Sequence, residues 1–235
     1  MSSQKVAVVT GASQGIGAAL VAAYRKLGYA VVANSRTIAP SDDPLVLTVP
    51  GDVAEPGLGA RIIEAGLHEF GRIDTLVNNA GVFLAKPFTE YTAADYDLVL
   101  GVNLRGFFEL SQSAAEAMLA RDGGHIVNIT TTLADHALST VPSALASLTK
   151  GGLNSVTKSL ATEYASQGIR VNAVAPGVIR TPMHPDETHE FLAALHPVGR
   201  LGEIEDIVDA VIYLEGAAFV TGEILHVDGG QLAGH

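Results

Sequence analysis

A glycine-rich turn near the N-terminus is the segment whose residue types point most directly to chemistry. Its sequence, TGASQGIG at positions 10–17, lies between an apolar run and a stretch with helical spacing. Glycines allow a tight turn and a close approach of the backbone to a ligand. A helix that begins there presents free N–H groups and the positive end of its dipole. The turn therefore predicts a site for the pyrophosphate of a dinucleotide.

The elements that must position this turn alternate along the chain. Apolar runs predict buried strands at 5–10, 29–34, 46–49, 73–78, 125–129, 170–174 and 224–227. Helical spacing predicts helices at 15–27, 57–70, 93–120, 143–166 and 203–214. Strands that alternate with helices form parallel sheets covered on both faces. We predict a single Rossmann-type α/β domain spanning 1–235, a doubly wound parallel sheet in a three-layer α/β/α arrangement, with ligands at the carboxyl ends of the strands.

Composition limits the classes of protein. The 235 residues are 48% hydrophobic and 17% charged, which suits one folded domain. The absence of cysteine excludes disulfides, thiolate nucleophiles and cysteine-ligated metals. A net charge of −11 argues against nucleic-acid or anionic-membrane partners. The apolar run at 6–9 is too short for a secretory signal, and no apolar run reaches the ~20 residues of a membrane helix. We therefore expect a cytoplasmic protein.

Several motifs together resemble the short-chain dehydrogenase/reductase family. The glycine turn has the family's TGxxxGIG spacing, and the remaining motifs follow in the family's order over nearly the whole chain: NNAG at 78–81, Asn103, Lys150, PG at 176–177 with Thr181 beyond, and VDGG at 227–230. The resemblance implies a nicotinamide cofactor held by Gly11, Ser13, Gln14, Gly15, Ile16, Gly17, Ser35, Arg36, Asp52, Val53, Asn79, Ala80, Gly81, Lys150, Pro176, Gly177, Ile179 and Thr181.

The end of the second predicted strand indicates which nicotinamide cofactor is bound. An acidic residue there would hold the ribose 2′-hydroxyl of NAD, but the chain has Ser35 followed by Arg36. A guanidinium pairs with a 2′-phosphate through two hydrogen bonds. We therefore predict NADP(H), although Gln14 stands where many family members carry a basic residue. Asp52 matches the family's contact to the adenine amine.

The resemblance also implies hydride transfer between the nicotinamide and a carbonyl or alcohol carbon. Lys150 matches the family's catalytic lysine and Asn103 its asparagine, which holds a water of the proton relay. Thr131 occupies the position at which the family has a serine that orients the substrate. Thr132 is an alternative, because the following loop is longer than in the family. The catalytic tyrosine belongs four residues before the lysine, where the chain has Ala146.

Three proton sources could replace the missing phenol. His136 precedes the long helix, and histidine titrates near neutrality. Lys150 could protonate an alkoxide through water, or the substrate could supply its own proton.

Residues 182–200 resemble a substrate lid. We interpret the histidines and carboxylates at 184–196 as polar lid residues, with no metal site.

Two main hypotheses remain open. The first is an NADP-dependent oxidoreductase acting on a carbonyl or secondary alcohol of a small molecule through a non-standard proton relay. The second is a non-catalytic NADP-binding sensor or assembly protein, which Ala146 favours. A third is that Ala146 is an introduced substitution. The resemblance also implies a homodimer or homotetramer built on the two long helices.

Overall fold

The computed structural model describes residues 4–182 and 186–234. Seven parallel strands form one sheet in the order β3-β2-β1-β4-β5-β6-β7. The strands are β1 (Val6–Thr10), β2 (Ala30–Ser35), β3 (Val46–Pro50), β4 (Thr75–Asn78), β5 (Gly124–Ile129), β6 (Ile169–Pro176) and β7 (Ile224–Val227). The strand order reverses between β1 and β4, and such a reversal opens a crevice for ligands at the carboxyl edge.

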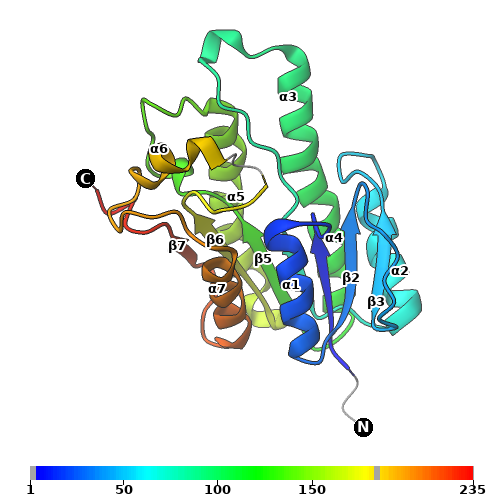
Figure 1. Cartoon of the computed structure of the whole chain (residues 1–235). Coiled ribbons are helices and arrows are strands. Elements are labelled where there is room, and N and C mark those ends of the chain that lie inside the picture. The colour runs from blue at the N-terminus through cyan, green and yellow to red at the C-terminus, as the bar shows by residue number, and fades with distance from the viewer. Residues whose placement is uncertain (1–3, 183–185, 235) are drawn as a thin grey trace.

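Helices cover both faces of the sheet (Figure 1). The helices are α1 (Gly15–Lys26), α2 (Leu58–Phe70), α3 (Ala93–Leu100), α4 (Phe107–Leu119), α5 (Ala144–Tyr164), α6 (His189–Ala193) and α7 (Ile204–Gly216). Residues of β1 alternate between two cores. Val6 and Val8 join the core beneath α2, α4 and α5, whereas Ala7 and Val9 join the core beneath α1 and α7. The doubly wound α/β sheet predicted from the sequence is confirmed.

One predicted helix differs from the structure. The segment 93–120 is not continuous, because a π-helical turn, Gly101–Gly106, separates α3 from α4. This turn carries Asn103, and π-turns of this kind often occur at functional sites. Helices α3 and α6 lie at the carboxyl edge of the sheet, the upper side in Figure 1. None of the helices within 4–182 and 186–234 combines the length and apolarity that crossing a bilayer requires.

A buried carboxylate ties the opposite edge of the sheet together. Glu215, at the end of α7, accepts hydrogen bonds from Tyr29 Oη (3.0 Å), Thr75 Oγ1 (3.1 Å) and His125 Nδ1 (3.0 Å). Burial alone would raise the pKa of Glu215, but these hydrogen bonds outweigh it and lower the pKa from 4.5 to about 2. The ionised carboxylate therefore stabilises the fold, well away from the carboxyl edge.

Candidate active site

A cleft of about 930 Å³ runs along the carboxyl edge of the sheet. Its wall combines residues from the glycine turn, the ends of β2, β4, β5 and β6, helix α5 and the segment around α6. Every residue that the sequence analysis assigned to cofactor binding or catalysis lines this cleft except Gly17 and Asn103. Residues far apart in the sequence are thus brought to one surface.

The glycine turn is shaped by close backbone contacts. Gly11 adopts a φ of +67°, which favours glycine. A Cβ at Gly17 would lie 2.2 Å from the Gly11 carbonyl oxygen, so Gly17 is needed for packing within the turn. Asn79 braces the same turn, since its Nδ2 donates to the Thr10 carbonyl oxygen at 2.8 Å. Gln14 at the start of α1 makes no side-chain capping bond, which leaves the helix N–H groups facing the cleft.

The end of β2 forms one end of the cleft. Ser35 is buried, and its Oγ has no hydrogen-bond partner in the described part of the chain. Arg36 is exposed and lines the cleft beside it. Asp52 follows β3 in the same wall, where its Oδ1 accepts from the Ala54 N–H at 3.0 Å. A buried hydroxyl and an adjacent guanidinium form a suitable site for a phosphate.

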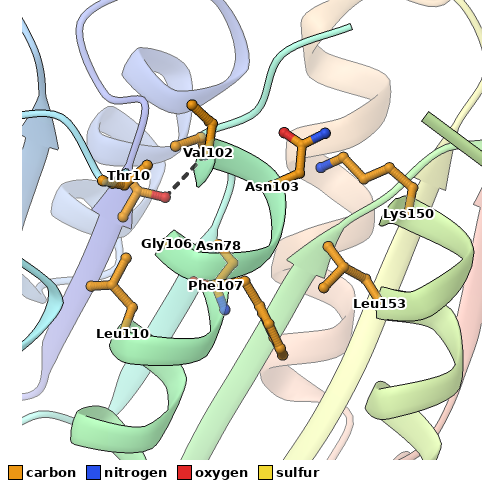
Figure 2. A pocket seen from close by; sticks show the side chains of 11 residues that line it. Thr10, Asn78, Val102, Asn103, Gly106, Phe107, Leu110, Lys150 and Leu153 are labelled. Carbon is orange, nitrogen blue, oxygen red and sulfur yellow. Dashed lines mark hydrogen bonds between the residues drawn. The ribbon is translucent and has the colours of Figure 1, made fainter. Parts of the chain in front are cut away.

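Lys150 and Asn103 lie together deeper in the molecule (Figure 2). Both line a cavity of about 10 Å³, the size of one water molecule. The Lys150 Nζ donates to the Ile129 carbonyl oxygen at 2.7 Å, and burial lowers the pKa of this amine to about 8. Asn103 Oδ1 accepts from the Val82 N–H at 2.9 Å. The lysine is therefore held in place with a pKa close to neutrality.

The two candidate threonines point in different directions. Thr131 lines the cleft, and its Oγ1 accepts from the Leu133 N–H at 3.3 Å, so its own proton can be donated. Thr132 is fully buried, and its hydroxyl lies 3.2 Å from the Ala175 carbonyl oxygen and 3.1 Å from Asp228 Oδ2. Thr131 is thus the threonine that a ligand in the cleft can contact.

Ala146 lies one helical turn before Lys150 and also lines the cleft, with 3% of its surface exposed. A methyl group cannot donate a proton. His136 does not appear among the described residues that line the cleft. Of the proton donors proposed from the sequence, Thr131 and Lys150 therefore line this part of the described cleft wall.

The lid segment is partly described. Met183, His184 and Pro185 lie outside the described residues, whereas Phe191 and Leu192 of α6 line the cleft. Within 4–182 and 186–234, no group of three or more His, Asp or Glu side chains could hold a metal ion.

His196 has a different position from the polar lid residue that the sequence suggested. It is 3% exposed, its Nε2 accepts from the Val178 N–H at 2.9 Å, and its Nδ1 donates to the Leu192 carbonyl oxygen at 3.0 Å. The imidazole therefore links the loop after β6 to α6. No sequence signal distinguished it from its exposed neighbours.

Gln231 also lines the cleft and was not predicted from the sequence. It directly follows the VDGG motif, which was the one signal that could have drawn attention to it.

Comparisons with known proteins agree with this geometry. A family model described as enoyl-(acyl carrier protein) reductase matches residues 11–231. L-xylulose reductase from Bos taurus is 39% identical over 241 residues, which cover 97% of this chain and 96% of the relative. A short-chain dehydrogenase/reductase from Serratia marcescens is 35% identical, with a TM-score of 0.90 over 99% of this chain and 100% of the other.

A second similar structure carries a bound cofactor. ElxO with NADP bound has a TM-score of 0.92 and 29% identity, and the match covers 98% of this chain and 100% of ElxO. A tyrosine-to-phenylalanine variant of ElxO with NADPH bound is equally similar. The family match, the relatives and the seven-stranded sheet agree, and the chain belongs to the short-chain dehydrogenase/reductase family.

Proposed function

We propose that the protein is an NADP(H)-dependent oxidoreductase that reduces a carbonyl carbon or oxidises a secondary alcohol. The observation that carries this proposal is one continuous cleft with Ser35 and Arg36 at one end and Thr131 and Lys150 at the other. Residues 1–235 act as one dinucleotide-binding domain, and the described residues of the lid predicted at 182–200, those around α6, cover the substrate end.

The residues present fit an NADP(H) molecule. The glycine turn and the start of α1 hold the pyrophosphate, while Ser35 Oγ and Arg36 hold the 2′-phosphate, with no carboxylate at either position to repel it. The other predicted cofactor residues also line the cleft. Asp52 and Val53 would contact the adenine, Asn79, Ala80 and Gly81 a ribose, and Lys150 the nicotinamide ribose. Pro176, Gly177, Ile179 and Thr181 would contact the carboxamide. Bound NADPH supplies the hydride.

The protein's own residues orient the substrate and supply a proton. The Thr131 hydroxyl donates to the carbonyl oxygen of the substrate. Lys150 provides the proton that this oxygen gains, because its lowered pKa of about 8 makes the ammonium a suitable acid near neutral pH. Asn103 lines the water-sized cavity beside Lys150 and completes the path by which the amine regains a proton. This relay does not require a phenol at Ala146.

A similar structure retains its cofactor after the loss of one tyrosine hydroxyl. The ElxO variant that carries phenylalanine in place of a tyrosine has NADPH bound. A site of this fold therefore retains the cofactor when a tyrosine hydroxyl is lost.

The test is consumption of NADPH with a panel of ketones, aldehydes and diketones. The unmodified chain, Ala146→Tyr and Lys150→Met are measured in parallel. Turnover by the unmodified chain that Lys150→Met abolishes supports the proposal. Ala146 favours one alternative, a non-catalytic NADP-binding protein. That alternative predicts NADPH binding without turnover, and activity in Ala146→Tyr alone.

We further propose that copies of the chain associate through α4 and α5. Phe108 on α4 and Leu148 on α5 are 60% and 58% exposed, and large apolar side chains at such exposure favour burial against a second subunit. Mass photometry of the native chain and of Phe108→Lys tests this proposal, since the charge should shift the population toward monomers.

A further inference from the structure

Gln231 has a buried polar atom that the fold does not satisfy. The side chain is 1% exposed and lies in the wall of the cleft. Its Oε1 has no hydrogen-bond partner in the part of the chain that the structure describes. Buried polar atoms are nearly always paired, because an unpaired one loses its hydration without compensation. An unpaired atom in a cleft wall is a candidate ligand contact.

The segment that carries Gln231 is held rigidly. The Asp228 carboxylate accepts from the N–H groups of Gly230 at 3.0 Å and Leu232 at 2.8 Å, and from the Thr132 hydroxyl at 3.1 Å. The Gln231 N–H donates to the Asp228 carbonyl oxygen at 3.1 Å. The glutamine is therefore positioned on a braced turn before any ligand binds, which reduces the entropy lost on binding.

Packing from the lid side fixes the same turn. A Cβ on Gly230 would lie 3.3 Å from the Pro197 ring, and one on Gly229 would lie 2.6 Å from Val198 Cγ2. The turn and the segment after α6 thus fit closely against each other. This contact places Gln231 beside the elements that cover the substrate end.

The sheet order separates Gln231 from the 2′-phosphate site. Gln231 follows β7 at one edge of the sheet, whereas Ser35 and Arg36 follow β2 near the other. Charged side chains among the described cleft-lining residues are Arg36, Asp52 and Lys150. Phe191 and Leu192 contribute apolar surface to the wall. The described wall has no carboxylate near Gln231 that would attract a cationic group of a ligand. This end of the cleft therefore favours a neutral ligand group.

We propose that Gln231 recognises a hydroxyl group of the substrate, which donates a hydrogen bond to Oε1. The inference rests on the proposed function and narrows its substrate class to hydroxylated ketones or aldehydes. The carbonyl oxygen accepts from Thr131, and a second group of the same molecule donates to Gln231. A substrate with the hydroxyl replaced by a methyl group leaves Oε1 unpaired.

The experiment compares three matched pairs of neutral ketones: hydroxyacetone with butanone, 4-hydroxy-2-butanone with 2-pentanone, and 5-hydroxy-2-pentanone with 2-hexanone. Each member of a pair differs by one hydroxyl in place of a methyl. Dissociation constants are measured by calorimetry on the protein saturated with NADP⁺, which prevents reduction. At least one hydroxyketone should bind about 3- to 10-fold more tightly than its partner, as one added hydrogen bond implies.

The variant Gln231→Met keeps the side-chain length and removes the amide. It should bring the dissociation constants of the two ketones in each pair within about twofold of each other. The melting temperature should stay the same or rise, because an unpaired buried atom is lost. Gln167→Met is the matched control, because Gln167 is an exposed glutamine outside the cleft wall. It should retain the native preference.

Four results overturn the inference. Equal binding of every pair by the native protein refutes it, and NADPH oxidation with the plain ketones then leaves the proposed function standing. A preference that survives Gln231→Met shows that another residue recognises the hydroxyl. A lower melting temperature together with an unchanged preference assigns Gln231 a structural role. Failure of every ketone to bind or to be reduced by NADPH-loaded protein overturns the proposed function as well.

Discussion

Raising the pH above 8 removes the proton from the Lys150 ammonium and should slow carbonyl reduction. Burial places the pKa of this amine at about 8, whereas an exposed lysine has a pKa near 10.4. The protonated fraction, and with it the rate, should fall about tenfold between pH 7 and pH 9 and about tenfold more by pH 10. An unperturbed lysine would keep the rate nearly constant to pH 9.

The assay is single-turnover reduction by pre-bound NADPH in a stopped-flow instrument, which separates the proton-transfer step from product release. Lys150→Met should lower the rate by about 10²–10⁴ and remove its dependence on pH above 8. Lys158→Met is the control, because it removes the same charge from an exposed position of α5. A rate that stays constant to pH 10 in the native protein, or that survives in Lys150→Met, would refute this role.

Three more predictions follow from the structure. Arg36→Ala should weaken NADPH binding roughly 10- to 100-fold in calorimetry, because charged hydrogen bonds to the 2′-phosphate are lost, and should leave NADH binding unchanged. An equal effect on both cofactors would contradict this prediction. Gly17→Ala should lower the melting temperature and the affinity for NADPH, because its Cβ would lie 2.2 Å from a carbonyl oxygen of the turn; Gly152→Ala, which has no neighbour within 4 Å, is the control. The Glu215 pKa of about 2 is below its unfolded value of 4.5, so the carboxylate stabilises the fold above pH 4.5 and loses this effect as the pH falls toward 2. The stability difference between native protein and Glu215→Gln, measured by urea unfolding, should therefore shrink by roughly 2 kcal/mol from pH 6 to pH 3, and a constant difference would refute the assignment.

The sheet could be predicted because its strands are apolar on both faces. In β1, four consecutive side chains are buried: Val6, Ala7, Val8 and Val9. Consecutive strand residues point to opposite faces, so this burial requires a sheet that is covered on both sides. The glycine turn could be predicted because its backbone conformation and close contacts require glycine at positions such as Gly11 and Gly17, and the spacing of these glycines is visible in the sequence. The interruption at Gly101–Gly106 was not, since apolar spacing continues through the π-turn.

The positions of two buried polar residues could not be predicted, because they depend on contacts with residues distant in the sequence. Gln231 is buried, and Pro197 and Val198 pack against Gly229 and Gly230, which precede it. His196 resembles a solvated lid residue in the sequence, but hydrogen bonds to Val178 and Leu192 hold it in the interior. The burial of a polar side chain reflects the tertiary structure, and local sequence does not encode it.

Transfer of deuterium from C4-labelled NADPH to a carbonyl substrate tests the central claim most directly. The chain with Ala146 unchanged is incubated with hydroxyacetone and with labelled NADPH of each C4 configuration, and the product is analysed by mass spectrometry. The proposed function predicts an alcohol one mass unit heavier from one of the two configurations, at a rate that Lys150→Met strongly reduces. Absence of labelled alcohol from the panel of ketones and aldehydes, while NADPH remains bound, would contradict it and establish a binding protein instead.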